Sequence, residues 1–195
     1  GDPLNIIKIF NDKFVDEIII CDINKEKGNN LEIEYLKDIF QSCRMPVCYS
    51  GNIKNLEQAS QLYSIGVEKI GLGDILNYDL NIISEISKTF GTQSVVAILN
   101  LVERNNKTYL YDYKNQTIKY NVDIFEFLKK IQDLGTGEII LHFVENDGNM
   151  KGYNYNLIDK VIDYIKVPLI FLGGLSSKDE ILKVNKNYNL KGIAG

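Results

Sequence analysis

The stretch GVEKIGLG (residues 66–73) has the pattern of a buried β-strand, with a turn glycine, a short apolar run and closing glycines. Yet Glu68 and Lys69 stand directly before that run. Two other stretches repeat the pattern, VDEIIICDI (residues 15–23) and GTGEIILHF (residues 135–143), where one acid precedes three or four apolar residues. The sequence thus places full charges where buried strands begin.

Short apolar runs of this kind alternate with amphipathic segments of helical length along the chain. The expected strands are EIIICDI, MPVCYSG, EKIGLG, SVVAILNL, EIILHF, VPLIFLGG and the last stub, KGIAG. The expected helices are approximately 4–13, 32–42, 56–65, 80–89, 124–134, 155–165 and 178–187. Near-continuous apolar strands alternating with helices predict a parallel sheet covered by helices. The segment 107–120, KTYLYDYKNQTIKY, alternates polar and apolar residues and predicts an inserted β-hairpin.

An internal repeat narrows the fold. Residues 17–19 (EII) match residues 138–140, and Pro46 with its following strand matches Pro168, at a period near 120 residues. Four βα units per period favour a half-barrel duplicated into a single (β/α)₈ TIM-barrel domain over residues 1–195. A doubly wound open sheet has the same rhythm, but no GxGxxG turn follows the first strand. We expect strands two to seven and part of eight, with strand one absent, in a piece of a longer protein.

Composition excludes several classes of function. The net charge of −4 argues against nucleic-acid binding, and no apolar run reaches the ~20 residues of a membrane helix. Three cysteines without CxxC spacing predict a reduced, cytoplasmic protein, in which Cys21 and Cys48 are small core residues. A single histidine, His142, argues against a histidine-rich metal centre, and we expect neither a metal nor a cofactor.

The three charges that begin the strands can be placed in this barrel. Glu17, Lys69 and Glu138 begin the even-numbered strands, and side chains from alternate strands share a layer of the interior. They are therefore expected either to form one charged layer at the floor of the barrel or to lie in solvent outside it.

The chain resembles the cyclase subunit of imidazole glycerol phosphate synthase over essentially its whole length. The stretches that carry the resemblance are GDPLNIIKIFNDKFVDEIIICDI, MPVCYSGNIKNLEQASQL, FGTQSVVAILN, LGTGEIILHFVENDGNMKGYN and VPLIFLGGLSS. This resemblance implies a glutaminase subunit docked at the barrel floor, whose ammonia passes a ring of charged residues and travels to a bis-phosphorylated substrate at the top. Glu17, Lys69 and Glu138 fall on three members of that ring.

The resemblance also implies catalytic positions, which this chain keeps only in part. The family uses one aspartate on strand one and one at the end of strand five, where this chain has Asn100. An amide orients a substrate but does not exchange protons near neutral pH. Asp22 matches an active-site carboxylate of the family, and His142 falls near its substrate-facing threonine, as a structural residue or a substrate contact.

Glycine-rich turns at strand ends imply two phosphate sites, because backbone N–H groups can converge there on phosphate oxygens. The second site is expected at Asp147 and Gly148 together with Gly173 and Gly174. The first site is degraded. Where the family has a turn of three glycines, this chain has Ser50-Gly51-Asn52. The carboxylate of Asp74 is expected at the position where the family binds a phosphate.

Shorter phrases, CRMPVCY (residues 43–49) and GVEKI (residues 66–70), resemble a paralogous branch that installs an acetamidino group during surface-glycan biosynthesis. We therefore expect a subunit that passes ammonia to a phosphorylated or nucleotide-activated acceptor. Three alternatives stay open: a histidine-biosynthesis cyclase, a non-catalytic scaffold for the glutaminase, and a phosphosugar isomerase relative that acts alone.

Overall fold

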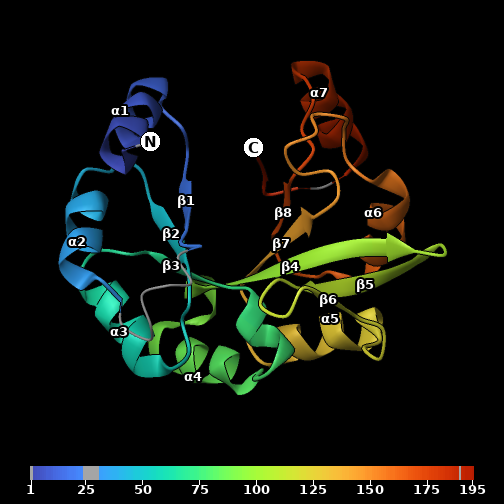
Figure 1. Cartoon of the computed structure of the whole chain (residues 1–195), viewed down its shortest axis with the longest axis horizontal. Coiled ribbons are helices and arrows are strands. Elements are labelled where there is room, and N and C mark those ends of the chain that lie inside the picture. Colours follow the sequence, from blue (N-terminus) through green and yellow to red (C-terminus); the bar gives the residue numbers. More distant parts are fainter. Residues whose placement is uncertain (1, 24–30, 189) are drawn as a thin grey trace.

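A computed structural model describes residues 2–23, 31–188 and 190–195. Its sheet contains parallel strands in the order β1-β2-β3-β4-β7-β8-β9, which curve around a common interior with the helices on the outside (Figure 1). The strands are β1 Ile18–Cys21, β2 Val47–Ser50, β3 Lys69–Leu72, β4 Val95–Arg104, β7 Glu138–Phe143, β8 Leu169–Leu172 and β9 Gly192–Ala194. This confirms the α/β barrel-type fold that the sequence predicted.

The helices begin and end within one residue of the segments predicted for them, except at the end of the sixth. They are α1 Pro3–Lys13, α2 Ile33–Gln41, α3 Leu56–Ser64, α4 Asn81–Phe90, α5 Ile124–Asp133, α6 Tyr155–Val161 and α7 Lys178–Asn187. The predicted sixth helix continues beyond α6 as a 3₁₀ turn, Ile162–Tyr164. α5 illustrates the local cause, since the Asp123 carboxylate caps its start by accepting from the N–H groups of Phe125 and Glu126 at 2.8 and 3.1 Å.

Alternation along the strands divides the apolar residues into two cores. The larger core joins the outer face of the sheet to the helices, and it includes Tyr49, Ile70 and Leu141. A separate inner cluster consists of Cys48, Val96, Ile98, Ile140 and Ile170. Since neighbouring residues of a strand point to opposite faces, the second set fills the interior of the barrel.

The segment 107–120 forms a hairpin over one end of the sheet. β5 (Lys107–Asp112) pairs antiparallel with the extended end of β4, and β6 (Thr117–Lys119) pairs with β5. Lys160 Nζ donates to Glu103 Oε1 at 2.6 Å, and this contact lowers the pKa of the Glu103 carboxyl. An ion pair and its hydrogen bonds thus attach the base of the hairpin to α6.

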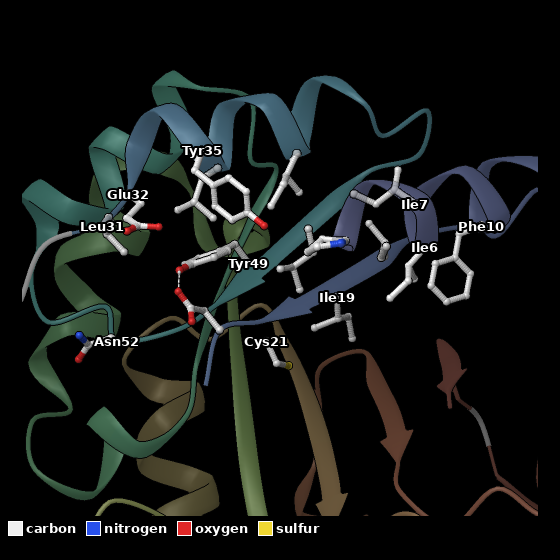
Figure 2. A pocket seen from close by; sticks show the side chains of 16 residues that line it. Ile6, Ile7, Phe10, Ile19, Cys21, Leu31, Glu32, Tyr35, Tyr49 and Asn52 are labelled. Atoms are coloured by element: carbon white, nitrogen blue, oxygen red, sulfur yellow. Dashed lines mark hydrogen bonds between the residues drawn. The ribbon is translucent and has the colours of Figure 1, made fainter. Parts of the chain in front are cut away.

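β1 and β9 end the sheet, and the part of the chain that the structure describes shows no pairing between them. The prediction that Cys21 is a core residue is wrong: its side chain is exposed because it ends an edge strand, whereas Cys48 is buried as predicted. Beside this edge, between β1, α1 and α2, lies a cavity of about 370 Å³ lined mainly by apolar side chains (Figure 2). Among the described residues, no helix is both long and apolar enough to cross a membrane.

Candidate functional site

The structure brings Glu17, Lys69 and Glu138 together at the end of the barrel where the strands begin. Lys69 Nζ lies 2.8 Å from Glu17 Oε2 and 3.1 Å from Glu138 Oε2. The three side chains come from the beginnings of β1, β3 and β7, which are alternate strands of the sheet. We call these residues the floor cluster. Their convergence on one ammonium group is the arrangement of an inward-facing charged layer.

The environment of Lys69 keeps it charged. Burial lowers the pKa of its ammonium group, but the hydrogen bond and charge of Glu17 and those of Glu138 outweigh burial, so the net direction is upward. Only 6% of the Glu138 side chain is exposed, against 26% for Glu17. A single cation therefore bridges one buried and one partly exposed carboxylate, which leaves the cluster with an excess of negative charge.

Above the floor cluster the interior is apolar. The inner cluster of Cys48, Val96, Ile98, Ile140 and Ile170 follows directly along the strands, so that Glu138, Ile140 and His142 alternate on the inner face of β7. On β4 the corresponding inner residues are Val96, Ile98 and Asn100, in register with those of β7. Polar groups thus lie at both ends of the interior, with hydrophobic side chains between them.

At the carboxyl ends of the strands, Asn100 and His142 are cross-strand partners on β4 and β7. His142 Nδ1 lies 2.9 Å from Asn100 Oδ1, and His142 Nε2 lies 3.3 Å from Asp147 Oδ2. Asn100 and His142 are each 9% exposed, while more than half of the Asp147 side chain is accessible. All three residues are site candidates predicted from the sequence, but only the structure shows that they form one hydrogen-bonded group.

The residues of the predicted second phosphate site lie beside this group. Gly173 approaches both His142 and Asp147, because a Cβ added there would lie 3.2 Å from each side chain. The turn at Gly174 is held by its carbonyl oxygen, which accepts from Gly152 N–H at 2.8 Å. The glycine turns after β7 and β8 therefore meet, as the alignment of parallel strand ends requires.

The predicted first phosphate site gathers around Asp22. A Cβ added to Gly51 would lie 2.5 Å from the Asp22 Cβ, and the Tyr49 hydroxyl donates to Asp22 Oδ2 at 3.1 Å. Burial and the Asp22 charge raise the pKa of the Tyr49 phenol. Asn52 lines the same cavity as Asp22 and Tyr49, and Figure 2 shows Tyr49 and Asn52 beside it. The carboxylate at the end of β1 thus lies against this turn, where it opposes binding of a phosphate dianion.

Two residues of this end were missed by sequence reasoning. Tyr113, assigned only to the hairpin, stacks on the His142 ring with centroids 6.1 Å apart, and its backbone N–H donates to Asp74 Oδ1 at 3.1 Å. Tyr49 was read only as part of a strand. Tyr49 could have been recognised as a site residue, because it is a tyrosine on an apolar strand just before a glycine turn. No feature of the sequence indicates that Tyr113 lies near His142.

No group of three or more metal-binding side chains occurs within the described ranges. The polar groups at this end are carboxylates, amides, phenols and one imidazole, a set suited to hydrogen bonding and proton transfer.

Comparison with known proteins places this chain in a family. All of residues 1–195 match the family described as "Histidine biosynthesis protein". A relative from Vibrio vulnificus (strain YJ016), provisionally named imidazole glycerol phosphate synthase subunit hisF3, is 40% identical over all of this chain and 75% of its own length. A relative from Leptospira borgpetersenii, provisionally named subunit HisF of the same synthase, is 35% identical over all of this chain and 77% of its own length.

A third relative, from Campylobacter lari (strain RM2100 / D67 / ATCC BAA-1060), carries the name imidazole glycerol phosphate synthase subunit HisF. It is 30% identical over 95% of this chain and 75% of its own length. The chain therefore belongs to the histidine biosynthesis protein family, among the HisF-type cyclase subunits of imidazole glycerol phosphate synthase.

Proposed function

We propose that this chain receives ammonia from a partner glutaminase docked at the floor cluster and delivers it through the barrel to an acceptor bound at the carboxyl ends of the strands. The observation that carries the proposal is the Lys69 ammonium bridging Glu17 and Glu138 below an apolar interior. A charged layer in this place costs desolvation, and a role in admitting a small molecule would account for its presence.

The interior suits neutral ammonia better than ammonium. Burying an unpaired cation among side chains such as Val96, Ile98 and Ile140 would be strongly unfavourable, whereas a small neutral amine loses far less on desolvation. The apolar interior would therefore pass ammonia while excluding its protonated form, and water would gain little by entering it.

For the acceptor, we propose a phosphorylated or nucleotide-activated sugar of acetamidino-sugar biosynthesis for surface glycans. Gly173 and Gly174, beside Asp147 and Gly148, support binding of one phosphate group. Asp22, against the turn at Gly51 and Asn52, disfavours a second one. One glycine turn is thus suited to a phosphate group and the other is not. This combination favours an acceptor other than the bis-phosphorylated substrate of the histidine pathway. The protein is proposed to act without a metal or cofactor, in the cytoplasm.

A histidine-biosynthesis cyclase is the second candidate, and the names of the relatives favour it. A non-catalytic scaffold that only activates its glutaminase is the third. The amide at Asn100 and the engagement of Asp74 with the hairpin support the scaffold, because neither residue offers a free acid or base.

One experiment separates these candidates. Full-length protein is supplied with excess ammonium and the bis-phosphorylated formimino substrate of the histidine pathway, and substrate consumption is compared with that of a histidine-pathway cyclase. Stimulation of glutamine hydrolysis by the protein is measured in parallel with its partner glutaminase.

The glycan assignment predicts no consumption of the formimino substrate, intact glutaminase stimulation, and ammonium-dependent amidination of a nucleotide-activated sugar. Turnover within about tenfold of the reference cyclase, roughly 1.4 kcal/mol in barrier, would instead identify a histidine-pathway enzyme. Stimulation without turnover of either acceptor would identify the scaffold, and absence of stimulation would exclude the ammonia conduit.

A further inference from the structure

His142 is the only histidine in the 195 residues, and both of its ring nitrogens are engaged at the carboxyl ends of the strands. Its imidazole is mostly buried on the inner face of β7, one layer above Ile140 and two above Glu138. Ammonia rising from the floor cluster through the apolar interior would therefore meet this ring where the apolar segment ends.

Asn100 determines which ring nitrogen holds a fixed proton. With its amide oxygen as acceptor, Nδ1 carries the proton, and Nε2 is left as the nitrogen that gains and loses one. Asp147 Oδ2 faces Nε2 at 3.3 Å, where a carboxylate oxygen can accept a hydrogen bond from this nitrogen when it carries a proton. Because the Asp147 side chain is 56% exposed, a bound acceptor can displace it from the ring.

Among the groups around the ring, the imidazole of His142 is the one that can hold a proton on one nitrogen and exchange a proton on the other. Tyr113 stacks on it, and burial together with the charges of Asp147 and Asp74 raises the pKa of the Tyr113 phenol, which stays neutral. The carboxylates that face this region are Asp147, beside Nε2, and Asp74, which accepts from the Tyr113 backbone. On β1, desolvation by neighbouring atoms and the charge of Asp147 raise the pKa of the Cys21 thiol, although the residue is exposed at the edge of the sheet.

Space beside the ring comes from β8. Gly173 lies against the imidazole edge, where a Cβ would be 3.2 Å from Cδ2. The ring therefore lies between a hydrogen-bonded side, formed by Asn100, and the glycine turn proposed to bind phosphate. An acceptor held by that turn would place its reacting carbon within reach of both ammonia and Nε2.

We propose that His142 is the proton-transfer residue of this site and that Asn100 is its positioning residue. This rests on the proposed function. The ammonia lone pair forms a nitrogen–carbon bond with the acceptor, a proton leaves that nitrogen for Nε2, and the bond from carbon to its leaving group breaks with the electron pair going to the leaving group. The imidazolium then returns its proton to the leaving group, which restores the starting state.

The first test measures protonation directly. Full-length protein labelled with ¹⁵N-histidine is titrated from pH 5 to 9 by NMR, and His142→Gln assigns the signals. Nδ1 should keep its proton while Nε2 titrates. Asp147→Asn should shift the NMR signal of Nε2, because it removes the carboxylate that faces this nitrogen at 3.3 Å. Glu145→Gln, in the same loop but paired with Arg104 at 2.7 Å, is the matched control and should change it little.

An Nε2 that stays protonated throughout, or a titration that Asp147→Asn leaves unchanged, would overturn the assignment. The second test drives wild type and His142→Gln with excess ammonium, so that neither the glutaminase nor the floor cluster limits the rate. We expect kcat to fall at least about 100-fold with little change in KM, and the acidic limb of the pH profile to disappear.

Unchanged kcat in His142→Gln would refute the catalytic role. Failure of wild type to use ammonium with either acceptor would refute the proposed function, and with it this role, while the NMR titration would still report whether the ring exchanges protons. The two failures are thus distinguishable.

Discussion

Lys69 Nζ lies 3.1 Å from Glu138 Oε2, although the two residues belong to β3 and β7, which are separated in the sheet by β4. Such a contact requires both side chains to point into the interior and to cross behind the intervening strand. It therefore identifies the inner face of the barrel without reference to any relative.

Replacing Lys69 with Met should remove the only cation of the floor cluster and leave two carboxylates facing each other. We expect a loss of about 1–3 kcal/mol in unfolding free energy, since the pair is only partly buried. Urea denaturation of the full-length protein measures this, with the exposed Lys129→Met as control. The double variant Lys69→Met/Glu138→Gln should be more stable than the two single-variant losses in unfolding free energy predict when added together. A double-variant loss equal to that sum would contradict the pairing of Lys69 with Glu138.

The same variant tests passage of ammonia. Lys69→Met should change glutamine-dependent turnover more than ammonium-dependent turnover, because added ammonium can also reach the acceptor from the open end of the barrel. Equal changes in both rates would argue that the floor cluster acts only on stability.

Asn100→Asp should shift the NMR signals of the His142 ring, because a carboxylate oxygen would then face Nδ1 at the atom that lies 2.9 Å from it. NMR titration of the ring measures the shift. Asn81→Asp, on the distant helix α4, provides a control of equal charge. An unshifted His142 would mean that the Asn100 contact does not persist in solution.

Gly174→Ala should destabilise the protein more than Gly148→Ala. Both glycines have positive φ, 108° and 71°, which costs an alanine about 1–2 kcal/mol. Only at Gly174 would the new Cβ also lie 2.6 Å from a backbone oxygen, that of Gly152, adding about 1–3 kcal/mol. Thermal unfolding of the two variants distinguishes them, and equal melting temperatures would contradict the close packing of the two turns.

Asp112 should contribute stability that is lost in acid. Burial alone would raise the pKa of its carboxyl, but hydrogen bonds from Tyr78 and Lys119 bring it to about 2, below the ordinary value near 3.9. Its stabilising effect, on the order of 2 kcal/mol, is therefore present above pH ~4 and lost as the pH falls toward 2.

The measurement for Asp112 is the difference in unfolding free energy between wild type and Asp112→Asn, taken at pH 6, 4 and 3. The difference should shrink as the pH falls, because the protonated carboxyl resembles the amide. Asp163→Asn, whose side chain is exposed, should differ little from wild type at each pH. A constant difference for Asp112→Asn would contradict the ionic role.

A protein consisting only of residues 1–195 should aggregate, because β1 presents an edge next to the apolar cavity of Figure 2. Ile6→Lys, at the rim of that cavity, should reduce aggregation in light scattering more than Leu182→Lys on α7, although Leu182 is the more exposed side chain. A monomeric, cooperatively melting wild-type product would refute the expectation.

Much of the fold was predictable because its signals are local. The spacing of apolar residues locates each helix to within a few residues, and the repeat around Glu17 and Glu138 by itself indicates a barrel. Cys21 was mispredicted because burial of a strand residue depends on whether a neighbouring strand covers it, and the apolar pattern of the strand does not contain that information.

The sequence by itself determined the order of strands and helices, the family, and the identities of the polar residues at both ends of the barrel. Only the tertiary structure decided which of these residues touch. Asn100, His142 and Asp147 form one group because the β4–β7 register aligns the first two and the following loop returns the third. Tyr113 joins them through the fold of the hairpin. Contacts between side chains from different strands depend on register, direction and loop path, which arise when the whole sheet is assembled.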